Sequence, residues 1–273
     1  MKLEKEKRNK RFDLPTLLLA LCTIVVLLYL LAPILITIVV SFNKGEFIMF
    51  PPSGFSLRWY KAFFGDYMWI MVFKNSLEIA IPTMLVSTAF GVLAALGYMK
   101  RNFRGRNAVN LIIMIPFLVP GIIIGISLLM FVHKIGLAGT ITSVVAGHCL
   151  WAIPTVFLLV QGVLAGYDFN VEDAARDLGA GPIKTFFLIT LPRIRIGVFI
   201  AMIFSFITSF GEFNIALFLT CPDTITMPVQ IWNSLKYEVS PIVAAVSTVM
   251  IFTTFLAIGI GAKLAGIRKI AGA

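Results

Sequence analysis

Two carboxylates, Glu78 and Glu212, lie inside long apolar stretches of the 273-residue chain. An ionisable side chain is costly inside a bilayer, and such residues usually mark a path for a solute or an ion. Glu212 follows Ser209 and is flanked by Phe210 and Phe213. A carboxylate beside aromatic rings attracts a cation, so this group predicts a path for an ammonium-bearing solute. Glu212 is the first candidate and Glu78 the second.

Each carboxylate also has a structural interpretation. Glu212 fits a hydrogen-bonded residue at a helix packing contact, and Glu78 lies four residues after Lys74, a spacing that favours an ion pair. Trp232 is a further aromatic residue that a cation would contact. The sequence leaves both interpretations open.

A polar segment, VEDAARDLGAGPIKTFFLITLP at residues 171–192, interrupts the apolar C-terminal half. Asn170 is predicted to cap a short helix in which Asp173 is the third residue. Gly179 is predicted to end that helix in a left-handed conformation, and Pro182 to begin a second short helix. We expect the two helices to meet outside the membrane at a glycine bend.

The first of these helices has two kinds of residue on its surface. One stripe is apolar and contains Val171, Ala174, Ala175 and Leu178. The other faces carry Glu172, Asp173, Arg176 and Asp177. Such a segment either binds a partner or only covers the ends of neighbouring membrane helices.

No catalytic or metal-binding pattern accompanies these residues. The chain lacks a GxxxxGK[ST] loop, so we expect no ATPase within it. Its three cysteines are far apart and form no CxxC motif. His133 and His148 are isolated, and we interpret them as residues packed between helices or at an interface. We therefore predict a non-catalytic protein without a metal or a cofactor of its own.

Long apolar segments must position these groups. The chain is 59% hydrophobic and only 13% charged, which indicates a membrane protein. A helix that crosses a bilayer needs about 20 apolar residues. Six segments reach that length: Leu14–Val40, Ile70–Tyr98, Ala108–Val132, Thr140–Ala165, Ile194–Leu219 and Ile242–Leu264. The predicted fold class is an all-α membrane protein with six transmembrane helices.

Basic residues give the orientation of these helices, because Lys and Arg concentrate in cytoplasmic loops. They gather in the N-terminal tail, after the second and fourth segments, and in the C-terminal tail. Both termini are therefore predicted to be cytoplasmic. We divide the chain into a basic tail (1–13) and a transmembrane domain (14–273) whose cytoplasmic loop covers residues 166–192. Short, scattered basic loops argue against nucleic-acid binding.

The polar segment resembles a motif of a known family. Acidic-Ala-Ala, then Gly, Ile and Leu-Pro follow the spacing of the "EAA" loop in permease subunits of type I ATP-binding-cassette importers. The matching residues are Asp173-Ala174-Ala175, Gly179, Ile189 and Leu191-Pro192. The chain departs from the pattern at its first position, where Asp173 replaces Glu and Glu172 precedes it. Among these permeases it looks closest to the spermidine/putrescine group, because SFGEF at 209–213 and MPVQIW at 227–232 are similar to that group.

The resemblance implies a set of partners and a mechanism. A second homologous permease, as a heterodimer, would complete the path across the bacterial inner membrane. Two ATPase subunits would bind Mg-ATP, and an extracytoplasmic solute-binding protein would deliver the solute. The "EAA" loop would dock as a coupling helix on one ATPase. The expected coupling residues are Glu172, Asp173, Ala174, Ala175, Leu178, Gly179, Phe186 and Phe187.

The resemblance implies a polyamine or a similar nitrogenous cation as the solute. An amino-acid derivative, a phosphonate or an opine would suit the same architecture. A self-contained secondary transporter is a further alternative, but such proteins usually contain inverted repeats, and no repeat is evident in this chain.

Overall fold

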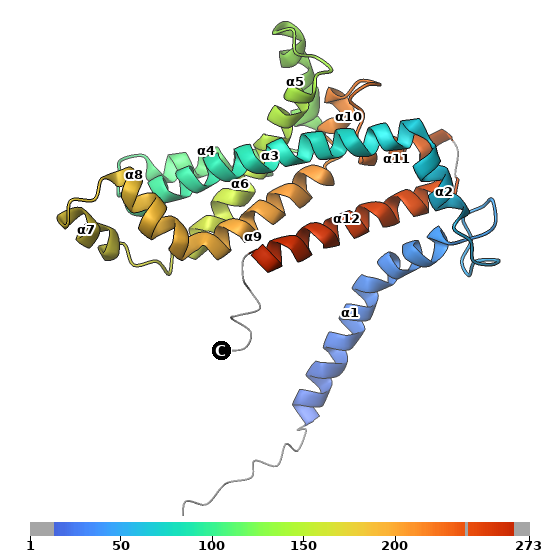
Figure 1. Cartoon of the computed structure of the whole chain (residues 1–273), viewed down its shortest axis with the longest axis horizontal. Coiled ribbons are helices and arrows are strands. Elements are labelled where there is room, and N and C mark those ends of the chain that lie inside the picture. The colour runs from blue at the N-terminus through green and yellow to red at the C-terminus, as the bar shows by residue number, and fades with distance from the viewer. Residues whose placement is uncertain (1–13, 238–239, 265–273) are drawn as a thin grey trace, which may run out of the picture.

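The computed structural model describes residues 14–237 and 240–264, and this part of the chain is helical. Four long helices form its body (Figure 1): α3 (Tyr67–Lys100), α6 (Ile141–Leu164), α9 (Leu191–Phe210) and α12 (Ile242–Leu264). α5 projects from one side of this body, and α1 leaves it at the other. The predicted basic tail, residues 1–13, lies outside the described residues.

Five helices in the described ranges are long and apolar enough to cross a membrane. They are α1 (Leu14–Ser41), α3 (Tyr67–Lys100), α6 (Ile141–Leu164), the continuous helix Pro182–Phe210, and α12 (Ile242–Leu264). The predictions of the first, second, fourth and sixth segments agree with these helices to within a few residues.

The third predicted segment, Ala108–Val132, is not one straight helix. It is divided into α4 (Arg106–Leu118) and α5 (Gly121–Lys134), which meet at 99°. Val119 at the break is extended because it precedes Pro120, and proline disfavours helical geometry in the residue before it. If the bent pair crosses the membrane as one unit, the total is six spans.

The fifth predicted segment, Ile194–Leu219, differs at both ends. The helix begins at Pro182 and passes without interruption through α8 (Pro182–Thr185), the π-helical turn η1 (Phe186–Thr190) and α9 (Leu191–Phe210). The expected separate second short helix is therefore the start of this long helix. At the other end α9 stops at Phe210, and a short helix, α10 (Ala216–Leu219), follows a turn.

The packed core lies between α3, α6 and α9. Eight buried residues form its main cluster: Val92, Ala95, Val156, Phe157, Val160, Leu164, Ile194 and Ala201. Gly91 allows α3 and α6 to approach closely, because a Cβ atom there would lie 2.6 Å from Cβ of Val156. Ser87 of α3 and Ser205 of α9 share a buried hydrogen bond of 2.5 Å. These contacts fix the three helices relative to one another.

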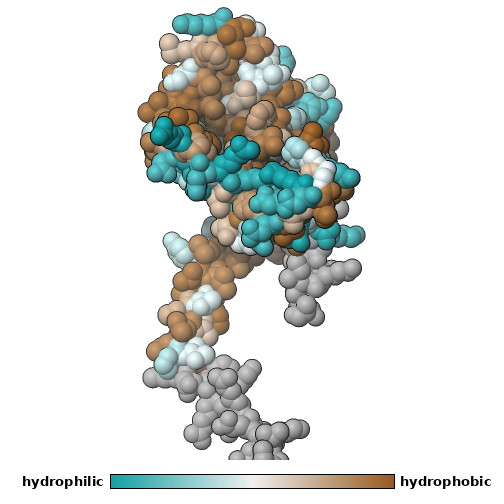
Figure 2. All heavy atoms as spheres, turned by 90° about the vertical axis from the view of Figure 1, so that its left-hand side faces the viewer, coloured by the Kyte–Doolittle hydropathy of each residue, from teal (hydrophilic) through white to brown (hydrophobic). Residues whose placement is uncertain are grey.

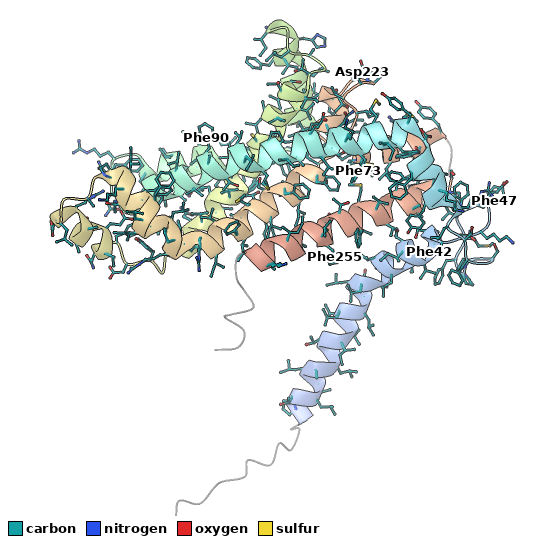
Figure 3. The ribbon with its side chains drawn as sticks, in the orientation of Figure 1. Phe42, Phe47, Phe73, Phe90, Asp223 and Phe255 are labelled. Atoms are coloured by element: carbon teal, nitrogen blue, oxygen red, sulfur yellow. The ribbon has the colours of Figure 1, made fainter. Side chains whose placement is uncertain are left out.

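Two shorter helices lie at the end of α3 that is distant from the polar segment. They are α2 (Arg58–Gly65) and α11 (Met227–Tyr237), the latter just after the loop that contains Asp223. In Figure 3 Phe73 lies in this half of α3, and its ring is 6.5 Å from that of Phe210. Side chains of α2, α3, α11 and α12 form a buried cluster at this end of the body, which contains Phe63, Trp69, Val72, Met227 and Val246.

Apolar side chains also cover much of the outer surface. α1 is exposed along most of its length, and burial begins only near Val40 and Ser41. Phe90 on α3 and Phe255 on α12 are 61% and 60% exposed and point away from the body (Figure 3). Figure 2 views the end that carries the polar segment, where hydrophilic residues gather, while α1 below it is largely hydrophobic. This distribution suits helices surrounded by lipid and a polar end in water.

Candidate functional site

The first helix of the polar segment is α7 (Asn170–Asp177). The prediction that Asn170 caps it is wrong, because Asn170 is its first residue. The backbone N–H of Asn170 instead donates to the carboxylate of Asp168 at 3.0 Å. The Asp168 side chain therefore accepts the N–H of the first residue of α7, whereas the sequence had predicted Asn170 as the capping residue.

The predicted end of α7 is confirmed. Gly179 has a φ of 86°, the left-handed conformation that favours glycine. Its N–H donates to the carbonyl of Arg176 at 2.8 Å, and the N–H of Ala180 donates to the carbonyl of Ala175 at 3.0 Å. This pair of bonds is the Schellman motif, which satisfies carbonyls at a helix end. The elbow between α7 and α8 is thus a defined turn.

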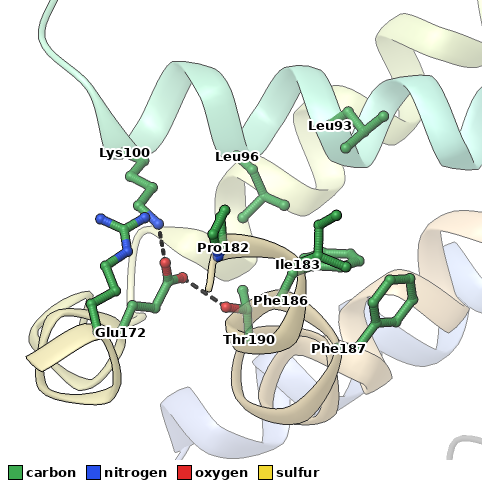
Figure 4. Close-up of a pocket in the computed structure, with 10 residues that line it drawn as sticks. Leu93, Leu96, Lys100, Glu172, Pro182, Ile183, Phe186, Phe187 and Thr190 are labelled. Atoms are coloured by element: carbon green, nitrogen blue, oxygen red, sulfur yellow. Dashed lines mark hydrogen bonds and ion pairs between the residues drawn. The ribbon is translucent and has the colours of Figure 1, made fainter. Parts of the chain in front are cut away.

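The sequence predicted that Glu172 faces solvent, and this prediction is wrong. Glu172 is 2% exposed and lies with Ala175 on the buried face of α7. The Lys100 ammonium at the end of α3 forms an ion pair with its carboxylate, and Thr190 Oγ1 donates to it at 2.7 Å (Figure 4). The apolar stripe did not predict the buried face of α7. Ala174 and Leu178 of that stripe are exposed, whereas the charged Glu172 is buried with two partners.

Burial of the Glu172 carboxyl acts to raise its pKa. Hydrogen bonds from Lys100 and Thr190, together with the charges of Lys100 and Arg176, outweigh burial, so the pKa lies below its ordinary value. Glu172 therefore carries a negative charge at neutral pH.

Other side chains of the elbow are exposed. Leu178 is 90% exposed, Ile183 74% and Phe187 59%. Asp173 is exposed as well and lies 3.6 Å from Arg176 in an ion pair along the helix. Apolar side chains displayed at a polar surface usually mark a site for a partner.

A groove of about 450 Å³ separates the elbow from α3 (Figure 4). Leu93 and Leu96 of α3 form one wall, and Ile183 and Phe187 line the other. Phe186, half-buried, stacks edge-on against Phe187 at 4.9 Å between ring centroids and packs on the main core. Of the coupling residues expected from the sequence, Leu178, Gly179 and Phe187 lie at the surface, as do Asp173 and Ala174, whereas Glu172 and Ala175 are buried.

The second candidate group surrounds Glu212. The sequence predicted that Glu212 lies inside a membrane helix, but α9 ends before it at Phe210. Glu212 lies in the turn between α9 and α10, where its carboxylate accepts N–H groups of Ile215 and Ala216 at 2.9–3.0 Å. His148 Nε2 is 3.4 Å from the same carboxylate. Glu212 thus caps α10 from a buried position, since it is 8% exposed.

From the sequence we interpreted His148 as a residue packed between helices or at an interface. Its buried position between helices confirms that interpretation. Its Nδ1 is 2.8 Å from Oγ of Ser209, and its side chain is 1% exposed. The contact between His148 and Glu212 could not be predicted from the sequence, because 64 residues separate them.

The other residues of the expected solute path are dispersed. Phe210 is buried against Phe206, whereas Phe213 and Trp232 do contact each other at 5.6 Å between ring centroids. Glu78 is exposed on α3. The structure shows no ion pair between Glu78 and Lys74, so the alternative suggested for Glu78 does not hold among the described residues.

A comparison with protein families identifies the protein class. Residues 87–265 match the model of the binding-protein-dependent transport system inner membrane component. The chain belongs to this family. It is a permease subunit of an ATP-binding-cassette importer, a multi-pass protein of the inner membrane that does not itself catalyse ATP hydrolysis.

Relatives and solved structures agree with this assignment. The putrescine transport system permease PotI of Escherichia coli (strain K12) is 31% identical over 231 residues, which cover 82% of each chain. The spermidine/putrescine permease PotC of the same strain is 30% identical over 223 residues, or 82% of this chain and 84% of PotC. A bacterial alginate ABC transporter, solved with its alginate-bound periplasmic protein, has the same fold, with a TM-score of 0.71, 16% identity and coverage of 92% and 93%.

Proposed function

We propose that this permease imports a polyamine or a similar nitrogenous cation, with a second homologous permease, two Mg-ATP-binding ATPase subunits and an extracytoplasmic binding protein. The carrying observation is the exposed elbow at Leu178 and Gly179. An apolar side chain that is 90% exposed beside a rigid left-handed turn suits insertion into a groove on a partner. We assign this surface to the contact with the ATPase.

Charge supports a cytoplasmic position for that elbow. The end of α3 and the start of α4 lie at the same end of the body as α7 (Figure 1). The basic residues there are Lys100, Arg101, Arg104 and Arg106. Basic residues concentrate on the cytoplasmic side of membrane proteins. In our proposal both termini are cytoplasmic, and α2 and α11 face the binding protein on the other side.

The exposed apolar surfaces support a partner within the membrane. α5 projects from the body and exposes Ile122, Ile123 and Met130. A second permease would cover such a surface while leaving a path between the two subunits. The relatives' names suggest the polyamine-type solute. The alternatives weighed from sequence, an amino-acid derivative, a phosphonate or an opine, use the same architecture.

The solute path itself stays a proposal. The bonds from Ile215 and Ala216 to Glu212 favour its packing interpretation over solute contact. If Glu212 does contact a cationic solute, Glu212→Gln should lower putrescine uptake without loss of assembly. Unchanged uptake would assign Glu212 to packing alone.

The docking assignment is tested with Leu178→Asp and Gly179→Asp. Either change places a charge on the proposed contact, and at Gly179 a side chain is also strained by the positive φ. We expect both variants to insert into the membrane but to lose co-purifying ATPase and putrescine uptake. Phe90→Asn, on the exposed side of α3, controls for a general loss of apolar surface. Retained ATPase and unchanged uptake in the Leu178 variant would refute the docking assignment.

The solute is tested separately. A thermal-shift screen of the cognate binding protein with putrescine, spermidine, amino-acid derivatives and phosphonates should show its largest stabilisation with a polyamine. Stabilisation by another class alone would reject the polyamine proposal and leave the importer assignment intact.

A further inference from the structure

Three elements meet at one buried carboxylate on the inner side of the elbow. Lys100 of α3 and Thr190 of η1 both bind Glu172 of α7 (Figure 4). We refer to these three residues as the Lys100–Glu172–Thr190 joint. Its acceptor side chain is 3% exposed and that of Lys100 is 25% exposed. The three residues of the joint line the groove between the elbow and α3, and the Glu172 carboxylate is buried there.

Burial distinguishes this ion pair from the two pairs that arginines form in the described residues. The Arg58–Glu46 and Arg176–Asp173 pairs are largely exposed, and such pairs hold little because water screens them. A buried charge that loses its partner is strongly unfavourable. Separation of Glu172 from Lys100 is therefore resisted in a way that separation of the exposed pairs is not.

The joint connects α7 to a part of the chain that is distant in sequence. α7 is linked to α8 by four residues, so those two helices move together through the backbone. Lys100 lies 72 residues before Glu172 and belongs to another helix. The Lys100–Glu172 ion pair gives a displacement of α7 a direct route to α3.

α3 extends from this joint to the far side of the body. Its 34 residues span about 50 Å at 1.5 Å per residue. Near its other end, Asn75 Nδ2 donates to the carbonyls of Asp223 and Ile225 at 2.8 and 3.1 Å. Ser76 Oγ accepts the N–H of Met227, the first residue of α11, at 2.8 Å. α3 thus holds the outer segment 223–227 at one end and the elbow at the other.

We propose that Glu172 is a positioning residue that fastens the coupling helix α7 to α3, so that displacement of α7 by the ATPase moves α3 and the outer segment with it. This inference rests on the proposed function. It gives Glu172 a role inside the permease in place of the ATPase contact expected from the sequence. Leu178 receives the motion, and the Lys100–Glu172–Thr190 joint passes it on.

Spin labels at Asn170→Cys and Phe90→Cys test whether α7 and α3 move as one body. Both positions are exposed, one at the start of α7 and one on the outer surface of α3. The label pair is placed in a permease whose Cys22, Cys149 and Cys221 are replaced by Ala. Distances are measured in the purified importer, in nanodiscs, without nucleotide and after trapping with ATP, Mg²⁺ and vanadate.

With the joint intact, we expect the same narrow distance distribution in both states. Glu172→Gln keeps the shape of the side chain but removes its charge, and Lys100→Met removes the other charge. Both variants should trap nucleotide and show a distribution that broadens and shifts on trapping. Arg101→Met is the matched control, because Arg101 is exposed and has no ion pair in the described residues. It should behave like the parent.

The charge swap Lys100→Glu with Glu172→Lys separates fastening from simple loss of structure. It restores an ion pair between the same two positions, and we expect it to recover the narrow distribution. Parent-like distances in Glu172→Gln, or a broad distribution in the swap, would overturn the proposal.

Leu178→Asp in the same assembly separates this inference from the function beneath it. If that variant keeps its ATPase and traps nucleotide normally, the proposed docking function fails. If it loses the ATPase while Glu172→Gln retains the parent's distances, the docking function stands and only the joint is refuted.

Discussion

Two buried glutamates, Glu172 at the elbow and Glu212 beside α10, are satisfied in different ways. Glu172 is bound by side chains from two other elements, 72 and 18 residues away. Glu212 is bound by backbone N–H groups only three and four residues later, and His148 lies nearby at 3.4 Å. One carboxylate joins separate helices, whereas the other shapes the turn in which it lies.

The difference shows what a buried charge contributes in each place. Loss of the Glu172 contacts changes how helices are held relative to one another. Loss of the Glu212 contacts exposes or strands N–H groups at the start of one short helix, and the long helices keep their packing. The predictions below should break or sharpen this contrast.

Lys100→Met should have the largest effect, because it leaves the Glu172 carboxylate buried without a cation. Removal of one partner of a buried pair costs about 3 kcal/mol. We expect a lower thermal midpoint for the variant in nanodiscs, with partial recovery in the double variant Lys100→Met/Glu172→Gln, which removes the stranded charge. A midpoint equal to that of the parent would show that the pair is no stronger than a surface contact.

Glu212→Ala should have a smaller effect, because it removes the acceptor for N–H groups of Ile215 and Ala216 but leaves no charge behind. An unsatisfied buried donor costs about 1–3 kcal/mol. The expected readout is faster amide hydrogen exchange in residues 213–219, with little change at α7. Glu212→Gln retains one acceptor and should exchange at an intermediate rate. Fast exchange at α7 in Glu212→Ala would mean that the two carboxylates are not independent.

The fold was predictable where a pattern along the chain decides it. Segment length and apolar composition predicted four of the five long helices to within a few residues, and Gly179 indicated the left-handed end of α7. The break between α4 and α5 has a signal in the sequence, because Val119 precedes Pro120. The prediction missed it because it used only the length of the apolar segment, which spans both helices. In the same way Gly211 ended α9 earlier than apolar composition suggested.

The candidate site was less predictable, because its decisive contacts are distant in sequence. Helical periodicity assigned Glu172 to an exposed face, as charged residues usually are. Only the fold brings Lys100 and Thr190 to it. The apolar segment and the aromatic neighbours of Glu212 made it a candidate for a solute path. A carboxylate that caps the following helix has the same appearance in the sequence.

The pH dependence of stability should separate the elbow from the rest of the permease. The pKa of Glu172 is lowered from its ordinary value of 4.5, since hydrogen bonds and nearby charges outweigh burial. Its contribution is therefore complete above 4.5 and is lost as the pH falls through the lower folded value. Glu172→Gln should flatten the acid side of the curve of thermal midpoint against pH. An identical acid slope in parent and variant would contradict this assignment.

Asp173→Asn should have the smallest effect on stability. Asp173 and Arg176 form an exposed pair within α7, which is worth about 0.5 kcal/mol or less. We expect a thermal midpoint within error of the parent, in contrast to Lys100→Met. A large loss of stability would show that the exposed face of α7 supports the fold as well as displaying a surface.

The π-helical turn at Phe186–Thr190 sets the rotation of the elbow around the axis of α9. A π turn contains one residue more than an α turn, and one residue corresponds to about 100° of rotation around a helix axis. If the same residues formed a regular α-helix instead, Ile183 would be rotated by about 100° around the axis of α9. The backbone geometry of this one turn thus determines the direction in which Ile183 projects from the helix axis, whatever side chains the turn carries.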